Sequence, residues 1–177
     1  MDREESKKIH EEIALDFIRR AYQAVAGETF EDIRPSETPD FLASDSKGRT
    51  VGIELTRLKF SPDEMWARQV MRRDQWADDN DSAWRLLGLL HAKGLKLQSG
   101  SWPGCQRKIL FVQVEDSTLE RLGPFEIDVA EAGGFDEVWL ADFTILKEQG
   151  SVFLQPIVHP LGSRLAWQPQ ERGKPFG

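Results

Sequence analysis

Apolar positions along the chain repeat with two different periods, and these periods predict the helices and strands. Near the N-terminus an apolar residue recurs every four positions, which predicts a helix over residues 4–25. These positions are Ile9, Ile13, Phe17, Ala21 and Val25. A Ser-Pro-x-Glu pattern predicts a second helix from residue 61 to about residue 76 or 78. Shorter helices are expected over residues 83–93, where Gly94 can end the helix, and over about residues 124–132.

Strands are predicted where β-branched and aromatic residues gather between turn-forming residues. Residues 39–44 and 50–56 flank a turn-rich stretch at 45–49, a pattern typical of a β-hairpin. Three later segments have the composition of buried strands: residues 108–114, 137–142 and 152–158. The tail from Pro160 is rich in Pro and Gly and is expected to be irregular.

This order of elements predicts an α/β fold. A hairpin and buried strands interspersed with helices imply an α/β/α sandwich, with a mixed central sheet and helices on both faces. A purely parallel doubly wound sheet is disfavoured, because a tight turn joins the first two strands. The 177 residues suit a single domain, with a core over about residues 4–158 and a tail over residues 160–177.

Composition and charge narrow the class of protein. Apolar residues make up 40% of the chain and charged residues 30%, which is typical of a globular protein. The apolar runs are far shorter than the ~20 residues that span a bilayer, and the charged N-terminus has no apolar signal core. With Cys105 as its single cysteine, the chain is expected in the cytoplasm, with no membrane partner. The net charge of -7 disfavours a basic coat for nucleic acid, although residues 57–73 are locally basic.

The predicted hairpin places two carboxylates side by side. A turn centred on Lys47 sets Asp40 opposite Glu54, on the face away from the apolar side chains. Opposed carboxylates repel unless a cation lies between them, and Mg²⁺ prefers oxygen ligands of this kind. Gly52 is expected to leave room for a ligand beside them. A simpler interpretation also stays open, in which Asp40 ends a strand and Glu54 lies on a solvated sheet face.

Pro39-Asp40, thirteen intervening residues and then Glu54-Leu55-Thr56 resemble the motif of the PD-(D/E)XK nuclease superfamily. The order of elements over roughly residues 4–142 is also similar to that superfamily's core. More closely, Pro-Asp-Phe-Leu followed by Gly-Ile-Glu-Leu-Thr resembles uncharacterised bacterial members. The resemblance implies a restriction-endonuclease-like α/β/α sandwich. It also implies Mg²⁺ or Mn²⁺ held by Asp40 and Glu54, and a nucleic acid substrate, with DNA favoured.

One position departs from the family's motif. Thr56 stands where the superfamily has a lysine that positions or activates the attacking water. Three possibilities follow: a cation supplied from elsewhere in the chain, hydrolysis by the metal and water alone, or an inactive enzyme. In an active enzyme, the Thr56 hydroxyl is expected to orient the water.

Polar residues on the predicted helices are candidates for the missing functions. Gln69 and Arg73 fall one turn apart on the apolar arc of helix 61–78, and family members often carry a glutamine there. Both are expected to contact the scissile phosphate, with Arg72 as the alternative to Arg73. The arginine guanidinium is expected to stabilise the negative charge of the pentacovalent phosphate. The alternative is that both side chains extend past the edge of the core to solvent.

The first helix offers an accessory metal ligand. The superfamily often places an acidic residue on this helix near the metal, and Glu11 lies within the apolar arc whereas Glu12 lies outside it. Glu11 is therefore the expected ligand and Glu12 the reserve. A carboxylate at the rim of the helix end is the simpler interpretation.

The sequence thus favours a metal-dependent nuclease. The alternative is a catalytically inactive, nuclease-like module with a nucleic-acid-binding or regulatory role. Thr56 in place of the motif lysine motivates this alternative. A protein-interaction domain is a third option, because Trp102 and Trp167 lie in a predicted loop and tail where they suit an interface, including that of a homodimer.

Overall fold

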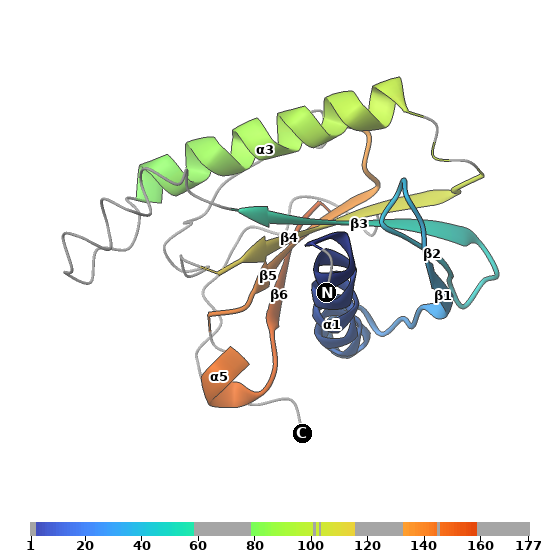
Figure 1. Cartoon of the computed structure of the whole chain (residues 1–177), viewed down its shortest axis with the longest axis horizontal. Helices are drawn as coiled ribbons and strands as arrows, with labels where there is room; N and C mark the ends of the chain where they lie inside the picture. Colours follow the sequence, from blue (N-terminus) through green and yellow to red (C-terminus); the bar gives the residue numbers. More distant parts are fainter. Residues whose placement is uncertain are drawn as a thin grey trace.

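The computed structural model describes residues 3–58, 79–100, 102, 104–115, 133–144 and 146–158. Within these residues the chain forms a six-stranded mixed sheet with a long helix on each face (Figure 1). The elements are α1 (Arg3–Ala26), β1 (Glu31–Pro35), β2 (Phe41–Ser44), β3 (Thr50–Leu58), α3 (Asp79–Ser99), β4 (Arg107–Val114), β5 (Glu137–Asp142), α5 (Leu146–Gln149) and β6 (Phe153–Val158). The predicted helices over residues 61–78 and 124–132, and the tail from Pro160, lie outside the described residues.

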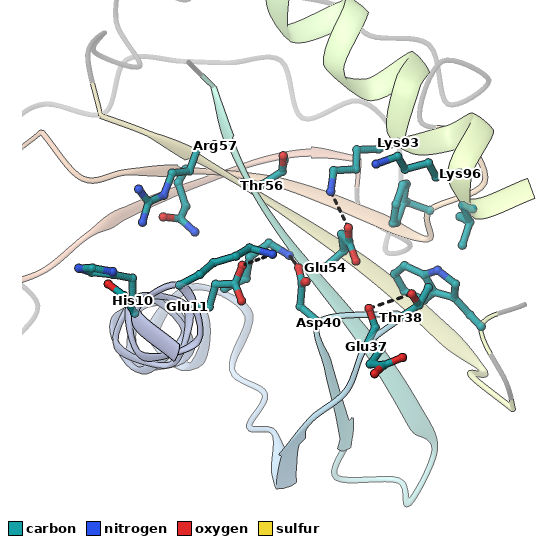
Figure 2. Close-up of a pocket in the computed structure, with 17 residues that line it drawn as sticks. His10, Glu11, Glu37, Thr38, Asp40, Glu54, Thr56, Arg57, Lys93 and Lys96 are labelled. Carbon is teal, nitrogen blue, oxygen red and sulfur yellow. Dashed lines mark hydrogen bonds and ion pairs between the residues drawn. The ribbon is translucent and has the colours of Figure 1, made fainter. Parts of the chain in front are cut away.

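The strands follow one another across the sheet in sequence order, from β1 to β6. β1, β2 and β3 are joined antiparallel, β3, β4 and β5 lie parallel, and β6 returns antiparallel to β5. The expected mixed α/β sheet is therefore present. The last β2–β3 partners on this side are Phe41 and Ile53, so β3 continues to Leu58 without β2 beside it (Figure 2).

Each face of the central strands packs against a different helix. Ile109 and Phe111 of β4 belong to the core that α1 covers, whereas Leu110 and Val112 belong to the core that α3 covers. All four side chains are fully buried. This alternation explains why β4 reads as a continuous apolar run, since neither face of the strand meets water.

The buried face of α1 agrees only in part with the four-residue repeat. Ile9, Ile13 and Val25 are more than 40% exposed, whereas Ala21 of the predicted set is buried together with Ala14, Leu15, Ile18 and Tyr22. A step of four residues advances the direction of the side chain by about 40° at 3.6 residues per turn. Five such positions spread around the helix instead of sharing one face. The buried set combines steps of three and four residues and so stays over the sheet.

Strand β1 was not predicted because its sequence carries little apolar signal. Its side chains are mostly exposed, and its pairing with β2 shifts register between Glu31 and Arg34. Asp32 lies in this irregular stretch with φ of 51°, and Pro35 ends the strand. Such features are common in edge strands, where one side of the backbone has no partner strand.

Helix α3 runs past the glycine that was expected to end it. Gly94 lies within the helix, and a Cβ atom added there would come within 2.6 Å of the Gly133 Cα. The glycine therefore permits the helix to approach the backbone before β5. α3 continues past this contact to Ser99, and Lys96 and Leu97 near its end line the cavity described below.

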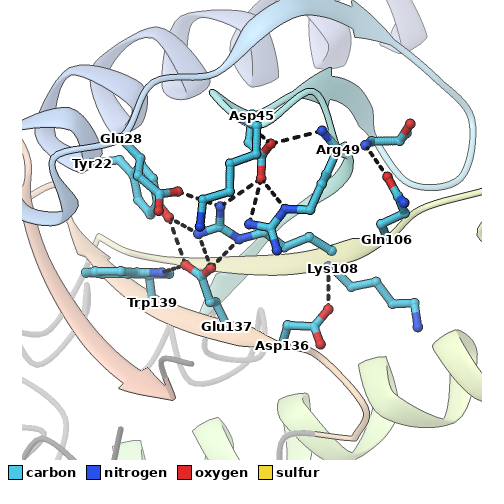
Figure 3. A network of polar contacts seen from close by, with 12 residues as sticks. Tyr22, Glu28, Asp45, Arg49, Gln106, Lys108, Asp136, Glu137 and Trp139 are labelled. Atoms are coloured by element: carbon cyan, nitrogen blue, oxygen red, sulfur yellow. Dashed lines mark hydrogen bonds and ion pairs between the residues drawn. The ribbon is translucent and has the colours of Figure 1, made fainter. Parts of the chain in front are cut away.

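A buried network of charged and polar groups joins the ends of several elements (Figure 3). At its centre the Arg107 guanidinium donates to Glu137 Oε1 at 2.6 Å, to Glu28 Oε2 at 2.5 Å and to the Tyr22 hydroxyl at 2.6 Å. The Tyr22 hydroxyl and the Trp139 indole N–H donate in turn to Glu137 Oε2. The network therefore connects α1, the segment after it, β4 and β5.

Carboxylates keep the buried guanidinium charged. Burial alone would lower the pKa of Arg107, but the ion pairs with Glu28 and Glu137 raise it above its ordinary value. Asp45 of the β2–β3 turn lies 3.5 Å from the guanidinium and also pairs with Arg49. Burial and the charge of Glu137 raise the pKa of the Tyr22 hydroxyl, so that it stays a hydrogen-bond donor.

Substituting Arg107 should strongly destabilise the fold. Arg107→Met leaves Glu137 as a fully buried carboxylate without its cation, and we expect the free energy of unfolding to fall by about 3–5 kcal/mol. Urea unfolding followed by circular dichroism measures the change. Lys108→Met is the matched control, since Lys108 is the next residue on β4, is only partly buried, and should change stability by about 0.5 kcal/mol or less. Equal stability of the two variants would contradict the central role of Arg107.

Candidate functional site

The candidate site lies at the C-terminal part of β3, which extends beyond its pairing with β2. Just before β2, Asp40 turns toward the free edge of β3, and its Oδ2 accepts the Leu55 backbone N–H at 2.8 Å. The carboxylate thus satisfies a backbone group that a longer β2 would have paired. The expected hairpin register is confirmed, with Phe41 opposite Ile53 and Ala43 opposite Val51. This register brings Asp40 to the level of Glu54.

A cavity of about 940 Å³ surrounds this edge. Its walls come from the N-terminal half of α1, the segment before β2, the end of β3, the C-terminal part of α3, and β4 (Figure 2). The acidic residues in its lining are Glu11, Glu37, Asp40 and Glu54, and the basic residues are Lys7, His10, Arg57, Lys93 and Lys96. Acidic and basic side chains thus meet in one concave surface.

Four of the predicted site residues lie together in this cavity. Asp40, Glu54, Thr56 and Glu11 all line it, although they come from three separate segments. Glu12 is exposed on α1 and does not line the cavity. The remaining predicted residues, Gln69 and Arg73 with the alternative Arg72, lie outside the described residues.

Asp40 is surrounded by other carboxylates. Burial and the charges of Glu54 and Glu11 together raise its pKa to about 6, against the opposing effect of the Leu55 backbone N–H. At neutral pH Asp40 is therefore ionised, but at a cost in free energy relative to a carboxylate in water. A bound cation would relieve this repulsion.

Lys93 of α3 reaches the predicted acidic pair from the opposite side. Its Nζ lies 2.5 Å from Glu54 Oε1, and both side chains are less than one-fifth exposed. Lys93 lies on the buried stripe of α3, at helical spacing from Leu86, Leu90 and Leu97. A lysine on an apolar stripe is the sequence signal that could have identified it, because such a charge needs a partner.

The donor atoms fit a divalent cation in part. Asp40 and Glu54 supply carboxylate oxygens, which suit Mg²⁺ or Mn²⁺ together with substrate phosphate and water. Within the described residues, however, no group of three or more His, Cys, Asp or Glu side chains is placed to hold a metal ion. Glu11, the expected third ligand, pairs instead with Lys7 at 3.3 Å.

The space at Gly52 is occupied by the chain itself. A Cβ atom added to Gly52 would lie 2.5 Å from the Trp102 indole and 2.9 Å from the Cys105 sulfur. The expectation that this glycine leaves room for a ligand was therefore wrong. Trp102 packs over Gly52 and against Phe135 in an edge-to-face arrangement, with ring centroids 5.6 Å apart. Trp102 therefore has a structural role in the core, and it also lines the cavity.

Comparisons of the chain with protein-family models, with curated proteins and with solved structures find no match. No helix among the described residues is long and apolar enough to cross a membrane.

The raised pKa of Asp40 predicts a specific dependence of stability on pH. The folded state holds the proton more tightly than the unfolded state, so without divalent cations stability should fall as the pH rises from about 4 to about 6. The loss should be on the order of 2 kcal/mol, at about 1.4 kcal/mol per pKa unit less solvent screening.

Asp40→Asn should remove this loss, because the amide oxygen can still accept the Leu55 N–H without a charge. Urea unfolding at pH 4 and pH 7 in the presence of a chelator measures it. Glu37→Gln is the control, since Glu37 is an exposed carboxylate of the same cavity and its substitution should leave the pH dependence intact. An unchanged pH dependence in Asp40→Asn would refute the assignment.

Proposed function

We propose that the chain is a metal-dependent nuclease that hydrolyses phosphodiester bonds of nucleic acid, with DNA as the favoured substrate. The observation that carries this proposal is the meeting of Asp40, Glu54 and Lys93 at the unpaired end of β3. Two carboxylates and one ammonium group are the chemical set of the PD-(D/E)XK motif that the sequence resembles. The α/β sheet with a helix on each face is compatible with the restriction-endonuclease-like sandwich that we propose for this chain.

Asp40 and Glu54 would hold the divalent cation, Mg²⁺ or Mn²⁺. Asp40 has a carboxylate on which charge is unfavourable without a counter-ion, and Glu54 already faces one cation, Lys93. When bound, the metal supplies positive charge and Lewis-acid polarisation of a phosphate oxygen. Glu11 would act as an accessory group, strengthening the negative field at Asp40 from α1.

Lys93 would take the role of the motif lysine, which Thr56 replaces in this chain. Its ammonium group reaches the cavity from α3, whereas the motif position on β3 carries Thr56. An ammonium group here can donate to a phosphate oxygen and stabilise the negative charge that develops during phosphoryl transfer. The Thr56 hydroxyl would orient the attacking water, and Gln69 and Arg73 would contact the scissile phosphate.

One observation also supports the alternative of a catalytically inactive module that binds nucleic acid. The ion pair of Lys93 with Glu54 already neutralises one of the two carboxylates, which would weaken binding of a metal. Such a module would bind nucleic acid equally well with and without divalent cations. Calorimetric titration with Mn²⁺ separates the two functions, because the nuclease requires a metal site that Asp40→Asn and Glu54→Gln weaken.

The carboxylate pair should be essential for cleavage. We expect the purified protein to cut DNA in Mg²⁺ or Mn²⁺, and we expect Asp40→Asn and Glu54→Gln each to lower the rate by about 100-fold or more. Single-stranded DNA, duplex DNA and RNA of the same sequence should be compared on denaturing gels. Glu12→Gln is the matched control, because Glu12 is an exposed carboxylate outside the cavity. Cleavage that persists in Asp40→Asn would show that another site or a contaminant is responsible.

Lys93 should affect the chemical step more than substrate binding. Lys93→Met is expected to lower kcat by about 10²–10³-fold with a smaller effect on KM, as for the loss of a group that stabilises transition-state charge. Lys96→Met, one turn further along α3, should change kcat by no more than about 3-fold, since loss of an exposed cation acts mainly through binding. Equal kcat values for Lys93→Met and the unchanged protein would exclude the proposed role.

A further inference from the structure

A buried amide lies in the wall of the cavity without a hydrogen-bond partner among the described residues. Gln113 of β4 is 3% exposed and lines the cavity, and no hydrogen bond joins its side chain to any of the described residues. Ile109 and Phe111, which precede it on the same face of β4, are apolar and fully buried. Burying an unsatisfied amide costs about 1–3 kcal/mol, and buried polar side chains in proteins are nearly always paired. Gln113 therefore occupies a position where packing alone favours leucine.

The position of Gln113 places it at one end of the cavity. Gln113 and Arg57 are partners in the parallel pairing of β3 and β4, so their side chains lie on the same face near the ends of both strands. Across this end lies the N-terminal half of α1, with His10 facing Arg57 (Figure 2). Side chains alternate along a strand, so Arg57 and Gln113 lie on the face that α1 covers, whereas Glu54 lies on the other face with Lys93 of α3. The cavity joins the two faces round the free edge of β3, where Asp40 lies, so a nucleotide chain bound at Gln113 can extend past Asp40 to Glu54.

The neighbouring cations are already neutralised by other residues. Arg57 Nε lies 3.2 Å from Glu115 Oε1, and Lys7 Nζ lies 3.3 Å from Glu11 Oε1. A phosphate group at this end would meet no uncompensated arginine or lysine among these residues. Phosphate would also satisfy only the N–H donors of Gln113, because phosphate oxygens are acceptors.

A nucleobase edge matches the amide better. Glutamine carries a donor and an acceptor side by side, and base edges present the complementary adjacent pair, as when glutamine contacts adenine. The base must be unpaired to reach a buried group, since pairing and stacking occupy its edge in a duplex. A cavity of about 940 Å³ is large enough to accommodate a nucleotide.

We propose that Gln113 recognises the base of an unpaired nucleotide that adjoins the phosphodiester bond at Asp40 and Glu54. The inference rests on the proposed nuclease function and adds the recognition of a single-stranded or extruded nucleotide. Gln113 is a specificity-determining residue in this arrangement. It makes no contact with the reacting phosphate.

Binding of two oligonucleotides tests the inference. Fluorescence anisotropy with Ca²⁺ in place of Mg²⁺ should compare a labelled single-stranded 12-mer with the same sugar-phosphate chain built from abasic residues. We expect the unchanged protein to bind the base-bearing strand about 10-fold more tightly, as for one bidentate base contact. Gln113→Leu should reduce this difference to within about 2-fold and leave the abasic affinity unchanged.

Stability distinguishes a recognition role from a structural one. Gln113→Leu should unfold at the same temperature as the unchanged protein or higher, because leucine removes an unsatisfied amide from the interior. Gln23→Leu is the matched control, since Gln23 is exposed on α1 outside the cavity and its substitution should preserve the difference between the two strands. A marked loss of stability in Gln113→Leu would show that the amide has a structural partner and would overturn the inference.

The failures of the two proposals are distinguishable. If the unchanged protein binds both strands equally, or if Gln113→Leu keeps the difference, base recognition by Gln113 is wrong while the nuclease function stands. If neither strand binds and neither is cut in Mg²⁺, the nuclease function falls and the inference falls with it.

Discussion

The buried ion pairs of Arg107 set the arrangement on which the rest of the structure depends. A guanidinium group in the protein interior requires carboxylate partners, and these come from the segment after α1 and from β5. The same group binds the Tyr22 hydroxyl, which fixes the C-terminal half of α1 against the sheet. Because α1 is one continuous helix from Arg3 to Ala26, this attachment also directs its N-terminal half toward the cavity at the ends of β3 and β4. The network thus lies at one end of the parallel strands and the candidate site at the other.

The candidate site is a consequence of two strands of unequal length. β3 runs beyond β2, so its backbone has a free edge that a side chain or a ligand must satisfy. Asp40 does so at Leu55, and this contact buries a carboxylate beside two others. Lys93 arrives from the face of the sheet that α3 covers and supplies a positive charge 2.5 Å from Glu54 Oε1. The total charge of -7 does not reveal this balance, because it averages over the whole chain.

Two residues of the cavity make unfavourable contributions to the free energy of folding that packing does not explain. Asp40 is ionised against its neighbours at neutral pH, and Gln113 buries an amide within an otherwise apolar strand face. Natural proteins usually retain such unfavourable groups where function requires them. Both residues line the same cavity and both would gain partners from one ligand, a cation with its nucleic acid strand. The coincidence of the two in one place is the strongest physical support for a binding site here.

The sequence by itself determined the hairpin, its register and the buried central strands, and therefore the approach of Asp40 to Glu54. These features depend on the two-residue period of strands and on a local turn, which neighbouring residues specify. The face of α1 that is buried, the strand β1 and the extension of α3 past Gly94 were decided by packing between distant segments, since the pattern of apolar residues does not say which surface lies opposite. Lys93 and Gln113 entered the site for the same reason. Lys93 is 39 residues from Glu54 in the chain, and tertiary contacts alone place that ammonium group beside the carboxylate.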